Sequence, residues 1–355
     1  MSVADLPPWL VRVFAFVFGA FFGSFFNVAI YRWPRELSVV SPSRSHCPHC
    51  GAQIPGHLNV PILGYLWLRG RTACCGERLS PRYLIVELAG AGLCLALAER
   101  LVVQAAPSVE LGPAVFSAAI EFAFVGGLLI ATFVDLEWRE IPDEVSIAGT
   151  ALGLATVSVR LGGPSPAEAA LGAGGAFLIV QLLLVWSWEQ LTGRRGMGEG
   201  DAKLLMFIGA FLGWQGALFA LVAGAFQGIA AVVVATATGA RLGAASDGAE
   251  APSSAGDVTE LDNLEGTRAD SPRIQPPPPG APLRTADGVT ATLEQQGRLL
   301  KVVDRHDRLL WIWRTDAEED LAARAVPFGP FLALGALEFL FFGPQLVDAY
   351  LALFL

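Results

Sequence analysis

Two acidic stretches lie at the ends of apolar segments, and their side chains could do chemistry together. The first is Gly198-Glu199-Gly200-Asp201, which stands directly before an apolar run that begins at Ala202. The second is Asp135, which ends another apolar run and is followed by Ile141-Pro142-Asp143. Glycine adopts positive φ and allows another part of the chain to approach closely. If both ends face the same side of a membrane, Asp135 and Asp201 can meet although they are distant in the sequence.

A pair of aspartates at a water-accessible membrane edge can share one proton and activate water for peptide hydrolysis. Two carboxylates within a few ångströms cannot easily both ionise, so such a pair titrates as a unit. Asp135 ends its helix and Asp201 begins another, so the two helix dipoles bias the shared proton toward Asp135. The alternative is that both side chains are solvated caps at the membrane boundary, with no catalytic role.

Four of the five cysteines lie in one polar loop, as Cys47-Pro48-His49-Cys50-Gly51 and Cys74-Cys75-Gly76. Two cysteines three positions apart on a tight turn form a metal knuckle, and a second pair in a cytosolic loop favours structural zinc over a disulfide. We expect Cys47, Cys50, Cys74 and Cys75 to bind one zinc ion, with a backbone kink permitted by Gly76. Two alternatives stay open, namely unmetallated thiols, or three cysteines with one of His46, His49 or His57.

The chain has 355 residues, of which 53% are hydrophobic and only 16% are charged, and its mean hydropathy is +0.51. This profile predicts an all-α polytopic membrane protein whose partner is the lipid bilayer and not nucleic acid. We expect about eight transmembrane helices and a small cytosolic cysteine-rich loop domain. The predicted spans are about Trp9–Tyr31, Leu84–Val103, Ala114–Val134, Val145–Val159, Ala169–Trp188, Ala202–Leu212, Gln215–Ala237 and Phe328–Leu355.

Arginine and lysine in the short loops set the orientation of a membrane protein. The loop after the first span contains only two acids, Glu36 and Glu77, and it carries a run of arginines: Arg32, Arg35, Arg44, Arg69, Arg71, Arg78 and Arg82. We therefore expect this loop to be cytosolic. Counting spans onward places the Asp135 and Asp201 loops on the same cytosolic side and both termini outside.

A long hydrophilic segment separates the last two predicted spans. Its first part is rich in Ala, Ser, Gly, Asp and Pro, which predicts a disordered linker. The later stretch Val302–Trp313 has the pattern of two short strands joined by a charged turn. The expected organisation is a first helix at 1–31, a zinc-binding loop at 32–83, a peptidase core at 84–241, a cytosolic and partly disordered insertion at 242–326, and a last helix at 327–355.

Several of these motifs together resemble bacterial prepilin leader peptidases, which are membrane aspartic proteases of the G-x-G-D type. The motifs are Gly23-Ser24-Phe25-Phe26-Asn27, the run from Ser45 to Tyr83 with its cysteines, Asp135 with Ile141-Pro142-Asp143, Gly198 to Leu205, and Pro327-Phe328-Gly329-Pro330. The resemblance covers nearly all of the chain except residues 242–325. It implies that Asp135 and Asp201 are the catalytic pair and that Asp143 lies outside it. Gly198, Gly200 and Lys203 are then expected to support the site.

The resemblance also implies the reaction. Such enzymes remove the short basic leader of type IV prepilins or type II secretion pseudopilins at the cytosolic face of the bacterial inner membrane. Members with the cysteine loop commonly also methylate the new N-terminus with S-adenosylmethionine. In Thr72-Ala73-Cys74-Cys75, Thr72 occupies the place expected for the first cysteine of the family's second C-x-x-C, and Cys74 is expected to stand in for it. A peptidase without methyltransferase activity is therefore one alternative. A non-enzymatic pilus or secretion scaffold is another. A transporter would place its acids near span centres, and here they lie at span ends.

Overall fold

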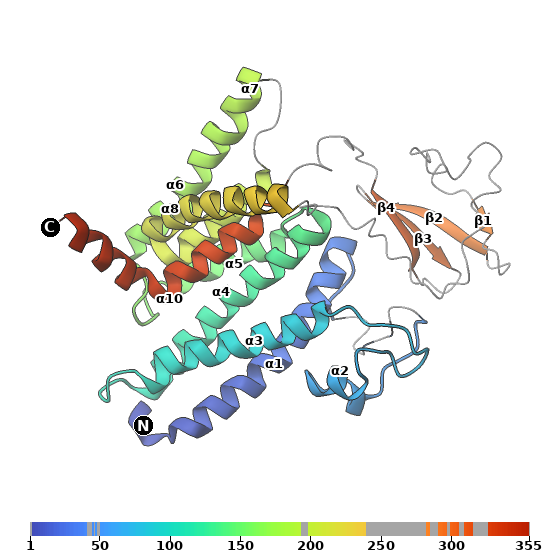
Figure 1. The fold of residues 1–355 in the computed structure, drawn as a ribbon, viewed down its shortest axis with the longest axis horizontal. Helices are drawn as coiled ribbons and strands as arrows, with labels where there is room; N and C mark the ends of the chain where they lie inside the picture. The colour runs from blue at the N-terminus through green and yellow to red at the C-terminus, as the bar shows by residue number, and fades with distance from the viewer. Residues whose placement is uncertain are drawn as a thin grey trace. The chain divides into compact units, whose positions relative to one another are not determined.

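The computed structural model describes residues 2–40, 45, 47, 50–192, 198–238, 282–284, 290–296, 299–304, 309–314 and 326–354. The chain divides into two compact units. The first unit holds residues 1–34, 81–243 and 326–355, and the second holds residues 35–80 and 244–325. The described part of the first unit is built of helices (Figure 1).

Each of the eight predicted spans coincides with helical residues of the first unit. Its helices are α1 Pro8–Arg32, α3 Arg82–Ala98, α4 Leu111–Trp138, α5 Asp143–Thr156, α6 Pro166–Ile179, α7 Trp188–Thr192, α8 Glu199–Thr238 and α10 Gly329–Phe354, with π-helical turns at Glu99–Val103 and Val180–Ser187. Within the described residues, four segments are long and apolar enough to cross a membrane: Pro8–Arg35, Leu111–Trp138, Pro166–Leu191 and Glu199–Thr238. The chain therefore has the helices of a membrane protein, and the count of eight spans stays a prediction.

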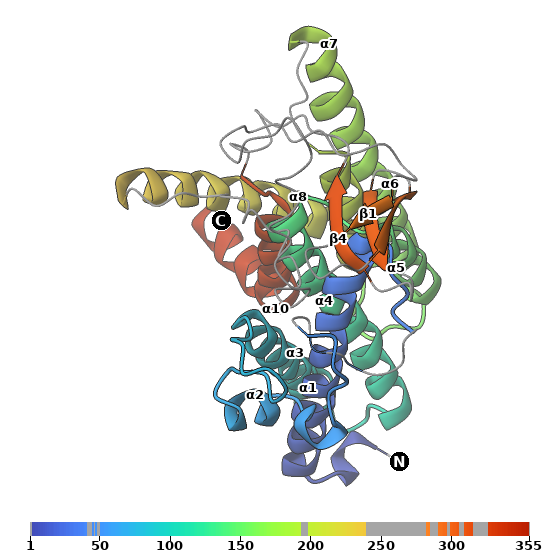
Figure 2. The ribbon, with the colours of Figure 1, turned by 90° about the vertical axis from the view of Figure 1, so that its right-hand side faces the viewer.

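Helices α1 and α3 run side by side (Figures 1 and 2) because glycines remove the side chains between them. A Cβ on Gly19 would lie 2.5 Å from the carbonyl oxygen of Gly90. Small residues let two helices approach closely, and the resulting van der Waals packing holds helices together in a bilayer. Asn27 of α1 adds a polar contact, because its buried side chain donates a hydrogen bond to the Tyr83 carbonyl at 3.0 Å.

Three phenylalanines form the core between α4 and α8. Phe124 of α4 stacks on Phe211 of α8 with ring centroids 4.5 Å apart. Phe207 of α8 contacts both rings, at 5.0 Å from Phe124 and 5.3 Å from Phe211. Gly149 of α5 leaves room for Phe207, since a Cβ there would lie 2.4 Å from its ring. The interlocked rings fix how far α8 lies along α4.

Helix α8 is interrupted at Gly213, where φ is 73° and ψ is −178°. Glycine is favoured there because other L residues rarely adopt positive φ. The interruption falls between the predicted spans Ala202–Leu212 and Gln215–Ala237. Buried Arg160 donates hydrogen bonds to the carbonyls of Ala210 and Phe211 at 3.4 Å, so its guanidinium caps the carbonyl end of the first half.

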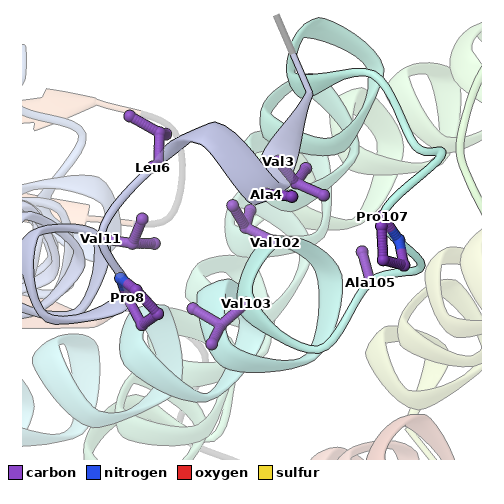
Figure 3. A pocket seen from close by; sticks show the side chains of 9 residues that line it. All are labelled: Val3, Ala4, Leu6, Pro8, Val11, Val102, Val103, Ala105 and Pro107. Carbon is purple, nitrogen blue, oxygen red and sulfur yellow. The ribbon is translucent and has the colours of Figure 1, made fainter.

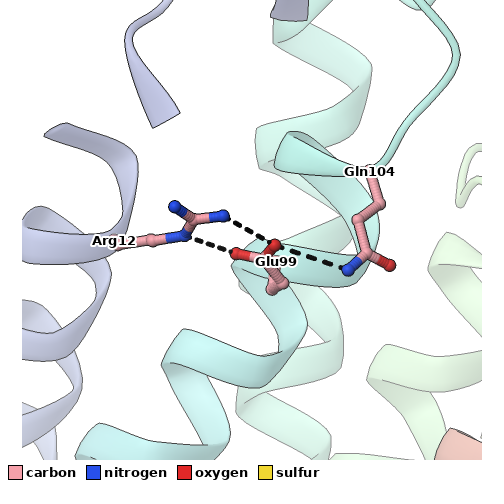
Figure 4. A network of polar contacts seen from close by, with 3 residues as sticks. All are labelled: Arg12, Glu99 and Gln104. Atoms are coloured by element: carbon pink, nitrogen blue, oxygen red, sulfur yellow. Dashed lines mark hydrogen bonds and ion pairs between the residues drawn. The ribbon is translucent and has the colours of Figure 1, made fainter. Parts of the chain in front are cut away.

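The end of the α1–α3 pair that is far from Asn27 and Tyr83 contains an apolar cavity of about 170 Å³ (Figure 3). Its lining includes Val3 of the N-terminal turn, Val102 of the π-helical turn that follows α3, and Pro107. At the same end, Arg12 of α1 forms a bidentate ion pair with Glu99 at 2.8 and 2.9 Å (Figure 4). Residues 82–103 span about 30 Å along a helix. The cavity and the Arg12–Glu99 pair therefore lie about 30 Å from Arg82.

The second unit contains the cysteine loop, with its short helix α2 Leu63–Trp67, and a four-stranded antiparallel sheet. The sheet has the order β1-β2-β3-β4, with β1 Pro282–Arg284, β2 Thr290–Gln296, β3 Leu299–Asp304 and β4 Leu309–Arg314. The strand pair predicted within Val302–Trp313 is confirmed as part of β3 and β4, where Val302 pairs with Trp311. The sheet adds a β element that the all-α fold class does not include. The predicted disordered linker, which precedes Gly288, lies outside the described residues except for Pro282–Arg284, which form β1.

Candidate functional site

Asp135 and Asp201 lie at matching distances from the phenylalanine core. Asp135 follows Phe124 by eleven residues on α4, and Asp201 precedes Phe211 by ten on α8. At about 1.5 Å per residue, both carboxylates lie roughly 15–17 Å along their helices from the stacked rings. Asp135 also acts electrostatically on Asp201. The packing of the two helices therefore brings together two acids that are distant in the sequence.

Asp135 is 6% exposed, near the end of α4. Its Oδ2 accepts a hydrogen bond from the backbone N–H of Gly329, the first residue of α10, at 2.9 Å. A Cβ on Gly329 would lie 2.7 Å from this oxygen, so a larger residue would displace one of the two groups. The first N–H groups of a helix lack helical partners and favour negative charge. The start of α10 therefore counteracts the negative carbonyl end of α4 at Asp135.

Asp201 lies in the first turn of α8 and is partly buried. Its backbone N–H donates to the carbonyl of Gly198 at 3.1 Å, and its side chain also interacts with the Gly198 backbone. A Cβ on Gly200 would lie 3.3 Å from the Cβ of Ile141, which is buried. The loop after α4 therefore packs directly on the glycine-rich first turn of α8.

Two ion pairs join residues on either side of the loop at 139–142 to other helices. Lys203 of α8 pairs with Asp143, the first residue of α5, at 2.6 Å. Arg82, the first residue of α3, pairs with Glu137 near the end of α4. Lys203, which we predicted to support the site, thus contacts the first residue of α5, directly after this loop.

The four loop cysteines form one cluster. The Sγ atoms of Cys47, Cys50, Cys74 and Cys75 all lie within 4.8 Å of one another. The Cys47–Cys75 and Cys50–Cys74 pairs have sulfur–sulfur distances of 3.8 and 3.2 Å. A tetrahedral zinc ion with Zn–S bonds of about 2.3 Å requires sulfurs about 3.8 Å apart. The cluster fits such an ion after a small opening of the second pair.

Histidine does not enter this cluster among the described residues. His57 is exposed and lies outside the group, while His46 and His49 lie outside the described residues. Thr72, which the sequence reasoning treated only as a missing cysteine, contacts the Cys75 sulfur through its Oγ1 at 3.0 Å. This contact, together with a hydrogen bond from the Glu77 backbone and the neighbouring thiols, lowers the pKa of the Cys75 thiol to about 7.

Sequence reasoning also missed the role of Gly329. The motif Pro327-Phe328-Gly329-Pro330 contributed to the resemblance, but its spacing gave no sign of a partner for Asp135. A proline-flanked glycine at a helix start was the one local signal of close backbone approach.

Two family models match the chain. Residues 17–101 match the bacterial peptidase A24 N-terminal domain, and residues 122–233 match the type IV leader peptidase family. The first match contains the four clustered cysteines and the second contains Asp135 and Asp201.

Curated relatives named prepilin leader peptidase/N-methyltransferase are similar to the chain. The one from Aeromonas hydrophila is 34% identical over 66% of this chain and 86% of its own length. The one from Myxococcus xanthus is 31% identical over 98% of this chain and 95% of its own length. The alignment with the second relative therefore extends over the insertion as well. No solved structure matches the chain.

Proposed function

The chain belongs to the type IV leader peptidase family, and from this premise we propose that it is an aspartic endopeptidase that removes the leader of type IV prepilins or type II secretion pseudopilins. Asp135 and Asp201 are the proposed catalytic pair. The observation that carries this proposal is the pairing of two carboxylates from distant helices, one of them buried and bonded to a backbone N–H at 2.9 Å. A solvated helix cap would need neither burial nor such a donor.

We propose that the pair shares one proton. The ionised carboxylate takes a proton from water as the water oxygen attacks the peptide carbonyl carbon, and the protonated carboxyl donates to the carbonyl oxygen. The carboxyl that took the proton from water then donates it to the leaving nitrogen as the C–N bond breaks, and a hydroxyl of the tetrahedral intermediate returns a proton to the other carboxylate. The pair returns to its single-proton state without a covalent intermediate.

The hydrogen bond from Gly329 changes our expectation of which acid holds the proton. The dipole of α4 alone biased the proton toward Asp135, but a backbone N–H at 2.9 Å stabilises the charged form of a carboxylate. The Asp201 side chain also interacts with the Gly198 backbone, so we propose that the two carboxylates share the proton without a fixed bias toward Asp135.

The proposed substrate is a single-span helix with a short basic leader, cleaved between a glycine and the following residue, usually phenylalanine. Glu144 and Glu199 are exposed in the first turns of α5 and α8. Acidic side chains beside the dyad attract a basic segment and raise its rate of encounter. Gly198 and Gly200 keep the approach to Asp201 low in side-chain bulk.

The second proposed activity is N-methylation of the new terminus. The relatives carry both activities in their names, and this chain retains the four clustered cysteines. We propose that these cysteines hold a zinc ion that cross-links the loop, and that S-adenosylmethionine supplies the methyl group.

The proposed location is the bacterial inner membrane, with eight spans and the dyad at the cytosolic edge. Arginines dominate the loop after α1, which supports a cytosolic loop. Arg82, the first residue of α3, pairs with Glu137, so the start of α3 and the dyad end of α4 lie together.

The test is incubation of the purified full chain in lipid with a synthetic prepilin, followed by mass spectrometry. We expect one product that begins at the residue after the leader glycine, and an added methyl group when S-adenosylmethionine is present. Intact substrate with a correctly inserted protein would contradict the peptidase and favour the scaffold. Cleavage without methylation would leave the peptidase-only alternative.

A further inference from the structure

The cysteine loop contains the same backbone turn twice, 25 residues apart. We name residues 45–54 the first knuckle and residues 70–79 the second knuckle. Three hydrogen bonds repeat between equivalent residues. Gly51 donates to Cys47 and Gly76 to Thr72, both at 3.0 Å; Cys47 donates to Ala52 and Thr72 to Glu77, both at 2.8 Å; Ile54 donates to Ser45 at 2.9 Å and Leu79 to Gly70 at 2.8 Å.

The left-handed glycine and the burial of the ligand positions repeat as well. Gly51 and Gly76 both adopt positive φ, 67° and 76°. At the first ligand position Cys47 is 3% exposed, and at the equivalent position Thr72 is 8% exposed. At the second position Cys50 and Cys75 are both exposed. Among the described residues, the two knuckles differ at the buried first ligand position, which is a cysteine in the first and a threonine in the second, and two residues earlier, where Gly70 adopts a positive φ of 67° and Ser45 does not.

We propose that Cys74 supplies the fourth sulfur of the metal site from outside the repeated turn, and that Thr72 occupies the vacated ligand position as a hydrogen-bond donor to Cys75. The Oγ1 of Thr72 lies 3.0 Å from the Cys75 sulfur, so the side chain at position 72 already points into the cluster. Cys74 reaches the cluster from the preceding position, with its sulfur 3.2 Å from that of Cys50. When Cys75 binds metal as a thiolate, the Thr72 hydroxyl is the donor.

The repeated turn predicts the effect of a cysteine at position 72. A thiol at position 72 would project from a backbone equivalent to that of Cys47, and the Oγ1 already at this position lies 3.0 Å from the Cys75 sulfur. Two ligands three positions apart on such a turn are the usual arrangement in zinc knuckles. Thr72→Cys should therefore complete a second regular knuckle, and Cys74 should then no longer be required.

The inference rests on the metal binding proposed above, and its test measures metal and not leader cleavage. Full-length wild type, Cys74→Ser, Thr72→Cys/Cys74→Ser and Thr72→Val are purified in lipid. Zinc is counted per chain, its retention is followed against a chelator, and the absorption of the cobalt-substituted protein reports the number of sulfur ligands.

We expect Cys74→Ser to lose its zinc and its four-sulfur cobalt spectrum, and the double variant to regain both. Thr72→Val should keep four sulfurs but lose metal to the chelator about 10-fold more readily, because the donor to Cys75 is gone. Thr72→Ser is the matched control and should behave as wild type. Full zinc with a four-ligand spectrum in Cys74→Ser overturns the proposal. So does a double variant that stays metal-free while wild type is loaded. A metal-free wild type overturns the proposed zinc itself, which distinguishes the two failures.

Discussion

The carboxylate pair and the cysteine cluster are assembled in opposite ways. Asp135 and Asp201 belong to different helices, and their meeting depends on the phenylalanine core and on a backbone N–H from α10. The cysteines belong to two short turns whose backbone hydrogen bonds are closed within ten residues each. One site is a product of long-range packing and the other of local turn chemistry.

This difference determines which substitutions each site should tolerate. A change in helix packing far from Asp135 should displace a carboxylate, because the two acids are positioned by separate helices. The knuckles keep their own geometry, so the same change should leave the metal in place. The two sites also lie in different units of the chain. Cleavage and zinc content can therefore be measured side by side as independent reports.

Replacing either proposed catalytic acid should have the largest effect. Asp135→Asn and Asp201→Asn each remove a proton-transfer group at nearly constant volume, so we expect cleavage of a synthetic prepilin to fall about 10³-fold. Zinc per chain should stay at the wild-type value. Cleavage near the wild-type rate in either variant, with membrane insertion verified, would show that the pair does no catalysis.

Gly329→Ala should have the next largest effect. Its Cβ would lie 2.7 Å from Oδ2 of Asp135, which forces the carboxylate and its donor apart. A displacement of about 1 Å at a catalytic group costs up to about 10²-fold in rate. Gly343→Ala on the same helix is the control, because its Cβ would have ordinary contacts at 3.4 Å. Equal cleavage by the two variants would remove Gly329 from the site.

Gly149→Ala tests the packing that aligns the two helices. Its Cβ would lie 2.4 Å from the ring of Phe207, and overpacking of this kind costs about 1–3 kcal/mol. We expect a lower thermal unfolding midpoint of the helical unit and about 10-fold slower cleavage, with zinc unchanged. Gly174→Ala, where the Cβ would meet open space, should leave both measurements at wild-type values. Zinc loss in Gly149→Ala would contradict the independence of the two sites.

Cys50→Ser should lower zinc content more than cleavage, which is the reverse of the preceding substitutions. Removal of one of four sulfur ligands should abolish stoichiometric zinc binding. We expect methylation to fall more than cleavage, which should change by only about 3-fold because the cysteines and the proposed catalytic acids belong to different units of the chain. Elemental analysis and the two activity assays on one preparation decide this. Parallel loss of both activities would mean that the loop supports the protease directly.

The smallest effect is expected at the ion pair between Asp143 and Lys203. Both side chains are partly exposed, and an exposed ion pair contributes about 0–1 kcal/mol. Asp143→Asn and Lys203→Met should therefore each slow cleavage by less than about 5-fold, and the double variant should be no slower than the worse single one. A variant of Asp143 as inactive as Asp135→Asn would mean that Asp143 is a member of the pair.

The cysteine site shows how far sequence reasoning extends when geometry is local. The spacing of Cys47 and Cys50 predicted a knuckle, and the four cysteines do form one cluster. The second knuckle was harder to interpret because only Cys75-Gly76 repeats Cys50-Gly51 in sequence. The equivalence of Thr72 and Cys47 depends on backbone hydrogen bonds, which a pattern of residue types does not specify.

The sequence by itself determined the helical segments, the acids at their ends, the cysteine knuckle and the strand pair within Val302–Trp313. These features depend on apolar length, residue type and short spacings, which act between neighbours in the chain. Only the tertiary structure decided that Gly329 donates to Asp135, that Lys203 reaches Asp143 and that the Thr72 hydroxyl contacts the Cys75 sulfur. Each of these depends on the distance between atoms of separate segments. That distance is set by how helices and turns pack, to within about an ångström, and no local pattern of residues encodes it.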